Sequence, residues 1–116
     1  MKIIERRDSY IFVYYDEKND VNSLITLMEE IAEACKKENI RKVLGDLSNM
    51  TGEPNFIDRF KLGIAGVKLL RGLAKIAIIY KQVESNRFAE NVAVNRGLPT
   101  LITHDIEQAK RWLEND

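Results

Sequence analysis

The chain has 116 residues, of which 45% are hydrophobic and 31% charged, which is typical of one soluble domain over residues 1–116. Its 18 basic and 18 acidic residues cancel, so no net field attracts nucleic acid or an anionic membrane. The longest apolar run, residues 76–80, is far shorter than the roughly 20 residues that cross a membrane, and we expect no signal peptide.

The first half of the chain predicts a hairpin, a helix and a strand. Two runs rich in β-branched and aromatic residues, 2–7 and 10–15, are separated by only two residues, which favours a β-hairpin. Apolar residues at intervals of three and four then predict an amphipathic helix over 21–38, with Cys35 and Met28 buried. Because Cys35 is the only cysteine, no internal disulfide forms, and we expect a cytoplasmic protein. Residues 41–47 predict a strand.

The second half continues the alternation of strands and helices. A long helix is predicted over about 55–71, closed by Gly72. Residues 75–80 are apolar at successive positions, which indicates a central parallel strand covered on both faces, with Ile76, Ile78 and Ile79 in the core. A helix over 84–96, a strand over 98–103 and a helix from about residue 105 complete a mainly parallel sheet with right-handed crossovers.

Three short segments carry a family resemblance. Asp46-Leu47-Ser48 ends the third predicted strand, and Phe56-Ile57-Asp58 and Leu62-Gly63 follow in the long helix. This order resembles the central segment of the STAS, or SpoIIAA-like, family, and residues 88–97 and 109–113 are similar to a STAS/Sec14-like branch. The resemblance implies a SpoIIAA-like α/β domain, with a mainly parallel sheet of about five strands, four helices and an N-terminal hairpin.

One family feature is missing from the sequence. Members that act as anti-sigma-factor antagonists are phosphorylated on a serine that follows an aspartate. The corresponding residues here are Asp58, Arg59 and Phe60, which carry no hydroxyl. A phosphoserine switch therefore cannot operate at this position. Ser48 and Thr51 carry hydroxyls in the loop upstream, and nothing in the sequence selects them for phosphorylation.

Polar residues follow each predicted parallel strand. The carboxyl ends of parallel strands share one edge of a sheet, where ligands commonly bind. We therefore predict a site for a small anion or polar ligand, formed by Asp46, Ser48, Asn49, Thr51, Gly52, Lys81, Arg87 and His104, with Asp16, Gln82 and Asp105 beside them. The same residue types also serve ordinary turns and helix caps, which is the alternative interpretation.

Motifs of common enzymes and metalloproteins are absent from the sequence. Neither a phosphate-binding P-loop nor a dinucleotide fingerprint occurs, and one cysteine with one histidine cannot supply the usual zinc ligands. We therefore expect no cofactor and no metal. A histidine-dependent triad would have to use His104, and no serine or cysteine lies in a nucleophile-elbow sequence. We expect a protein that is not an enzyme.

The long helix has two apolar sides. The predicted core side holds Phe56, Phe60, Gly63, Ile64, Val67 and Leu70. At ~100° per residue, Leu62, Gly66 and Leu69 fall together on another side. We call these three residues the interaction stripe and predict that it meets a partner helix, an acyl chain or a membrane surface.

Two functional hypotheses follow from these features. The first is a non-enzymatic regulatory or binding module that acts on a protein partner, or on a second copy in a homodimer, through the loop 48–54 and the long helix. The second is a carrier or sensor of a small hydrophobic molecule or lipid, as a Sec14-like relationship implies. An enzyme that uses the strand-end edge ranks third. Peripheral membrane contact stays open, and no transmembrane segment is expected.

Overall fold

A computed structural model describes residues 1–115 of the chain, and all of their side chains except that of Ser85. The predicted elements are present in the predicted order, with small shifts at their ends. They are β1 (Lys2–Arg7), β2 (Tyr10–Tyr15), α1 (Val21–Glu38), β3 (Lys42–Asp46), α2 (Phe56–Leu70), β4 (Lys75–Ile79), the 3₁₀ helix η1 (Glu84–Asn86), α3 (Arg87–Asn95), β5 (Thr100–Thr103) and α4 (Ile106–Glu114). Asp116, the last residue of the predicted domain, lies outside the described residues.

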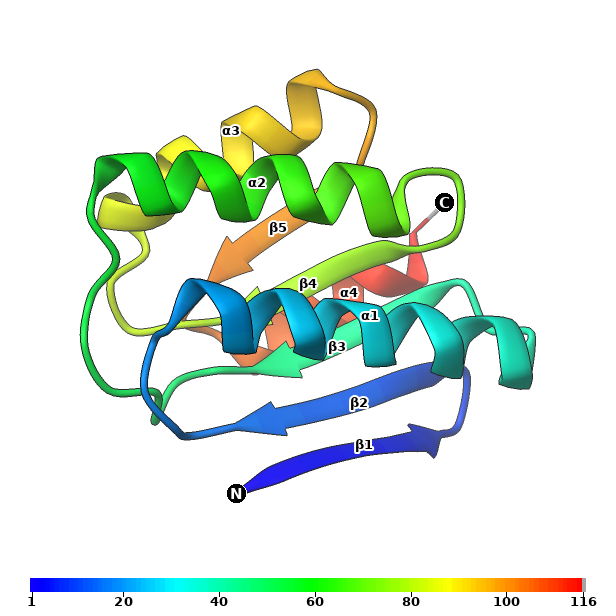
Figure 1. Ribbon diagram of the computed structural model, residues 1–116. Coiled ribbons are helices and arrows are strands. Elements are labelled where there is room, and N and C mark those ends of the chain that lie inside the picture. The colour runs from blue at the N-terminus through cyan, green and yellow to red at the C-terminus, as the bar shows by residue number, and fades with distance from the viewer. Residues whose placement is uncertain (116) are drawn as a thin grey trace.

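The five strands form one sheet in the order β1-β2-β3-β4-β5 (Figure 1). β1 pairs antiparallel with β2, and Asp8 in their connection takes a left-handed φ of 51° that tightens the turn. The other pairs are parallel, with Asp46 opposite both Tyr14 and Ile79, and Ile79 opposite Thr103. The carboxyl ends of β2 to β5 therefore lie along one edge of the sheet, which we call the C edge. The predicted mainly parallel sheet is confirmed.

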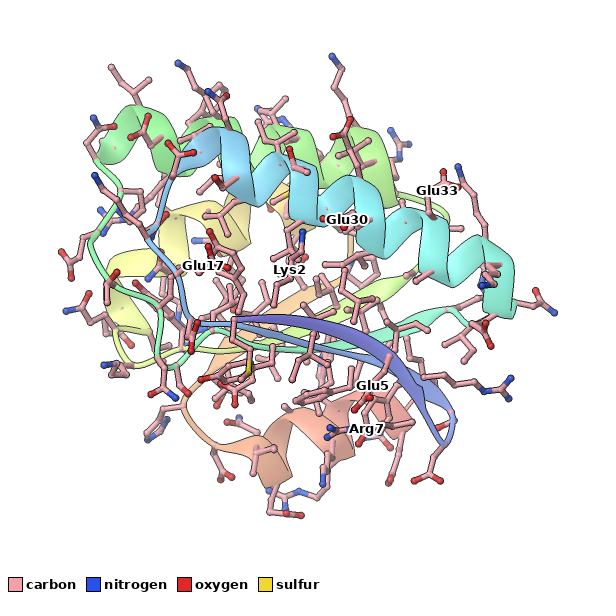
Figure 2. The ribbon with its side chains drawn as sticks, turned by 60° about the horizontal axis from the view of Figure 1, so that its bottom comes forward. Lys2, Glu5, Arg7, Glu17, Glu30 and Glu33 are labelled. Carbon is pink, nitrogen blue, oxygen red and sulfur yellow. The ribbon has the colours of Figure 1, made fainter. Side chains whose placement is uncertain are left out.

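Helices cover both faces of the sheet. α1, α2 and α3 lie on one face and α4 lies on the other (Figures 1 and 2). Successive residues of a strand point to opposite faces, so Val43 joins the core under α1 to α3 while Leu44 packs with Ala109 of α4. The prediction that β4 is covered on both faces is confirmed, although Ile78 is only half-buried. No helix formed by residues 1–115 is both long and apolar enough to cross a membrane.

α1 follows its predicted pattern. The Asp20 side chain accepts a hydrogen bond of 3.0 Å from the Ser23 backbone N–H and caps the helix start. Cys35 is buried as predicted, and its burial raises the pKa of the thiol. The prediction for Met28 is wrong, because Met28 is half-buried beside a cavity and Leu27 is buried instead.

Charged side chains connect α1 to the hairpin at the surface. Figure 2 shows Lys2 of β1 beneath Glu30 of α1, and the Lys2 Nζ atom lies 2.5 Å from Glu30 Oε1. Arg6 forms a similar pair with Glu38 at 3.5 Å. Exposed pairs of this kind add little stability, so the apolar face of α1 carries most of its attachment to the sheet.

α2 packs against α1 and α3 on its two flanks, and its contacts with the described strands are few (Figure 1). Gly66 is buried, and Leu62 and Leu69 pack against the core. The predicted placement of the interaction stripe on a free surface is therefore wrong. The physical reason is that α2 has helices on both flanks, so the side of the helix that is buried is wider than one stripe and is rotated toward Leu62.

The predicted core side of α2 is correspondingly wrong at its first turn. Phe56 is 64% exposed and Phe60 is 40% exposed. The Phe56 ring stacks on Phe88 of α3, with the ring centroids 4.3 Å apart. The two phenylalanines thus lie over the outer side of the contact between α2 and α3, where aromatic stacking partly covers them.

Candidate functional site

A cavity of about 140 Å³ lies between α2 and the sheet, and its lining is almost wholly apolar. α1, α2, α3 and the four parallel strands all contribute to the lining, for example Leu27, Met28, Leu62, Ile76, Ile78 and Ala93. Near the C edge the cavity is lined by Asn19, Met50, Pro54 and Asn86. The candidate site is this partly open space, which the sequence did not predict.

Glycines contribute to the lining, and Gly45 leaves the most room among them. Gly45 of β3 and Gly63 and Gly66 of α2 all line the cavity. A Cβ atom added to Gly45 would meet only the Ala77 carbonyl oxygen, at 3.9 Å, so a longer side chain would project into free space. Glycine within a strand commonly marks a place where a ligand or another backbone comes close. Gly45, in the interior of strand β3, was the one signal in the sequence that could have indicated the cavity.

The loop after β3 is ordered by its own polar side chains. Asp46 Oδ1 accepts hydrogen bonds from the Ser48 backbone N–H at 3.0 Å and from its hydroxyl at 2.6 Å. The Asn49 amide donates to the Tyr14 hydroxyl at 3.0 Å, and that hydroxyl donates to Asp16 at 3.3 Å. These side chains therefore act as turn and strand-connecting groups, which is the alternative interpretation given to them above.

The same loop is held against the start of α1. The Thr51 backbone N–H donates to the Glu17 carbonyl at 3.2 Å, and the Asn19 N–H donates to the Thr51 carbonyl at 2.8 Å. Gly52 takes a left-handed φ of 79°, which allows the chain to turn toward α2. Thr51 and Gly52 thus lie beside the polar end of the cavity.

The remaining predicted site residues fall into two other places. Lys81 and His104 lie together in a shallow depression at the C edge, with Gln82, Val83 and Glu84. The Arg87 guanidinium already has partners within the domain. Its Nη1 atom lies 2.8 Å from Glu90 Oε2 and donates to the Ile102 carbonyl at 3.1 Å. The predicted set therefore shares one edge of the sheet and does not form one pocket. That any of these residues binds a ligand stays a prediction.

Among the described residues, the C edge shows no arrangement of metal ligands. Among the residues that the structure describes, no three histidine, cysteine, aspartate or glutamate side chains are grouped to hold an ion. The Met1 amino group lies 2.6 Å from Asp16 Oδ1, and its hydrogen bond lowers the pKa of that carboxyl below the ordinary value. Asp16 is thereby already paired at this edge.

The hairpin, the parallel strands and the distribution of helices over the two faces define an α/β domain of SpoIIAA-like fold. The chain is similar to a solved structure of that fold, an uncharacterized protein of the DUF3478 family from Shewanella loihica PV-4. The two share 23% identity with a TM-score of 0.55, over 97% of this chain and 92% of the other. At this identity the likeness establishes the fold, and the SpoIIAA-like prediction is confirmed. No family model and no curated protein matches the chain.

Proposed function

We propose that this chain is a non-enzymatic binding module that holds a small apolar molecule in the cavity beneath α2. The observation that carries the proposal is the cavity itself, whose walls come from three helices and four strands and are almost wholly apolar. A pocket of this kind favours a ligand through burial of apolar surface, at roughly 25 cal/mol per Å². Its lining offers little for acid–base or nucleophilic chemistry, which supports binding in preference to catalysis.

The volume limits the size of the ligand. An engineered protein cavity of about 150 Å³ lined by apolar side chains stays dry and accepts benzene. A cavity of about 140 Å³ suits a body of similar size, such as one aromatic ring or a short alkyl chain. A long lipid chain exceeds this space, so the ligand is a small hydrophobic molecule.

The position of α2 favours a sensor over a simple carrier. α2 is attached through its flanks to α1 and α3 and has few contacts with the strands below it. A ligand in the cavity adds contacts to the underside of α2, and so favours the arrangement of α2 that fits around it. The loop 48–54 and the first turn of α2 would then report the occupancy of the cavity.

A second candidate function is contact with another protein or with a second copy of the chain. Phe56 and Ile57 in the first turn of α2 are 64% and 62% exposed, which is unusual for adjacent large apolar residues. Light scattering on the wild type and on a Phe56→Ser, Ile57→Ser double variant tests self-association. A lower mass for the variant supports a homodimer, and a monomeric wild type excludes it.

Calorimetric titration with benzene tests the primary proposal. Gly45→Val adds a branched side chain where Gly45 lines the cavity, and should weaken benzene binding by at least about tenfold, or about 1.4 kcal/mol. Gly45→Ala, which fills less space, should give a smaller loss. Ile57→Ser, on the exposed side of α2, is the matched control and should bind like the wild type. A wild type that binds no benzene contradicts the proposal.

A further inference from the structure

We infer, on the basis of the proposed function, that Arg87 and Glu90 form a latch between α3 and β5 whose release admits the ligand to the cavity. Both side chains come from the first turn of α3, and both bind the backbone of Ile102 in β5. Glu90 and Ile102 also line the cavity, so the bond between them joins two parts of its wall. When this bond breaks, the space between α3 and β5 can widen.

The latch binds backbone groups that the sheet leaves unpaired. β5 is the last strand in the sheet order. The Thr103 carbonyl accepts a hydrogen bond of 2.9 Å from the Tyr80 N–H, so Thr103 turns its backbone groups toward the neighbouring strand β4. Because the backbone groups of successive strand residues point to opposite sides, Ile102 directs its N–H and its carbonyl away from β4. Without partners from α3, both groups would be unpaired at the edge of the sheet.

Each of these two backbone groups has a side-chain partner in the latch. The Ile102 N–H donates to Glu90 Oε2 at 2.6 Å, and the Ile102 carbonyl accepts from Arg87 Nη1 at 3.1 Å. Arg87 Nη1 also donates to Glu90 Oε1 at 2.9 Å, which fixes the position of the carboxylate. The Glu90 side chain is only 13% exposed, so these charge-assisted bonds are less screened by water than those of a surface ion pair. The latch therefore connects α3 to β5 at one residue of the strand.

The other contacts of α3 with the sheet are limited. Among the strands, α3 contacts mainly β5 (Figure 1), and the cavity lies beneath it. Ala89 and Ala93, which line the cavity with Glu90, have short side chains that fill little of the space. On its other flank α3 packs closely against α2, where Phe88 stacks on Phe56. Elements with few buried contacts open most readily, so release of the latch lets α3 turn away from β5 about its contact with α2.

Glu90→Leu tests the latch, because leucine cannot accept a hydrogen bond from the Ile102 N–H. Methyl NMR line shapes of Ile76 and Ile78, recorded during a benzene titration, give the rate constant of association. In Glu90→Leu this rate constant should rise by at least about tenfold, as expected when opening costs about 1.4 kcal/mol less. Glu90→Gln keeps an acceptor without the charge and should give a smaller rise. Glu84→Gln is the matched control, since Glu84 lies 3.9 Å from the same guanidinium but is 91% exposed, and it should associate like the wild type.

The outcomes distinguish the two proposals. If the wild type binds no benzene, the proposed function and this inference both fail. If benzene binds but associates no faster with Glu90→Leu than with the wild type, the inference is overturned and the cavity keeps its proposed function. An equal rise in Glu84→Gln also overturns the inference, because the contact with Ile102 would then not be the cause. Should circular dichroism show that Glu90→Leu does not fold, Glu90→Gln decides the question: faster association supports the latch, and an unchanged rate constant overturns it.

Discussion

A Cβ atom added to Gly63 of α2 would lie 2.8 Å from the Cγ1 atom of Val92 in α3. The backbone of α2 therefore approaches α3 as closely as a glycine allows, and the Ala89 carbonyl oxygen, at 3.2 Å from the same position, gives no room on that side. This contact fixes one flank of α2. The other inward glycine, Gly66, is less confined, since its Cβ would lie 3.4 Å from a terminal methyl group of Leu98.

Gly63→Ala should therefore destabilise the protein and Gly66→Ala should not. Overpacking against Val92 costs about 1–3 kcal/mol, which exceeds the gain of about 1 kcal/mol from replacing a glycine within a helix. At Gly66 the gain should remain, because the flexible end of Leu98 can move. Urea unfolding of the two variants measures the difference. Equal stability of the two variants would show that α3 yields to a side chain at Gly63.

Leu62→Glu should destabilise the fold by about 2 kcal/mol or more, because Leu62 packs against the core and lines the cavity. Ile57→Glu is the control on the exposed side of the same helix and should change the free energy of unfolding by about 0.5 kcal/mol or less. If Leu62→Glu is as stable as the wild type, Leu62 lies on the surface, as the sequence pattern had suggested.

Cys35 should resist modification in the folded protein. Its side chain is 1% exposed, and burial raises the pKa of its thiol, so the reactive thiolate is disfavoured as well as shielded. A thiol reagent should react with Cys35 slowly in buffer and rapidly in concentrated urea. Fast reaction in buffer would show that α1 opens readily from the sheet.

The Asp20 cap should make stability depend on pH in the acid range. Hydrogen bonds from Ser23, first from its backbone N–H, lower the pKa of Asp20 in the folded state below the ordinary 3.8. The carboxylate therefore adds stability above the ordinary pKa, and this contribution is lost as the pH falls through the lower folded-state value.

Asp20→Asn is the matched variant, because asparagine also caps helices and does not titrate. Unfolding at about pH 6 and about pH 2.5 should show a larger loss for the wild type than for Asp20→Asn. The same loss in both proteins would mean that other carboxyl groups cause the acid sensitivity.

The fold could be predicted because most elements have a clear pattern. The intervals from Leu24 to Cys35 define α1, and the continuous apolar run in β4 indicates a strand covered on both faces. The inward side of α2 could not be predicted, because its apolar residues surround much of the helix and the choice between Leu62 and Phe60 depends on where α1 and α3 lie. Asp46 and Ser48 were placed correctly at the C edge, in a turn.

The cavity could not be predicted for a different reason. The cavity results in part from the absence of side chains at glycines. The sequence does not show which residue lies opposite a glycine in the folded chain. The parallel pairing of β3 directs Gly45 toward the α1–α3 face. The rotation of α2 turns Gly66 inward, and the two glycines therefore line the same space.

Methyl NMR spectra recorded during a benzene titration test most directly whether a small apolar molecule enters this cavity. The methyl groups of Met28, Ile76 and Ile78, which line the cavity, should show saturable shifts. Leu44 and Leu113 belong to one apolar cluster on the α4 face, and their methyl signals should not shift. No shifts at the first three residues, or equal shifts on both faces of the sheet, would contradict the proposed binding.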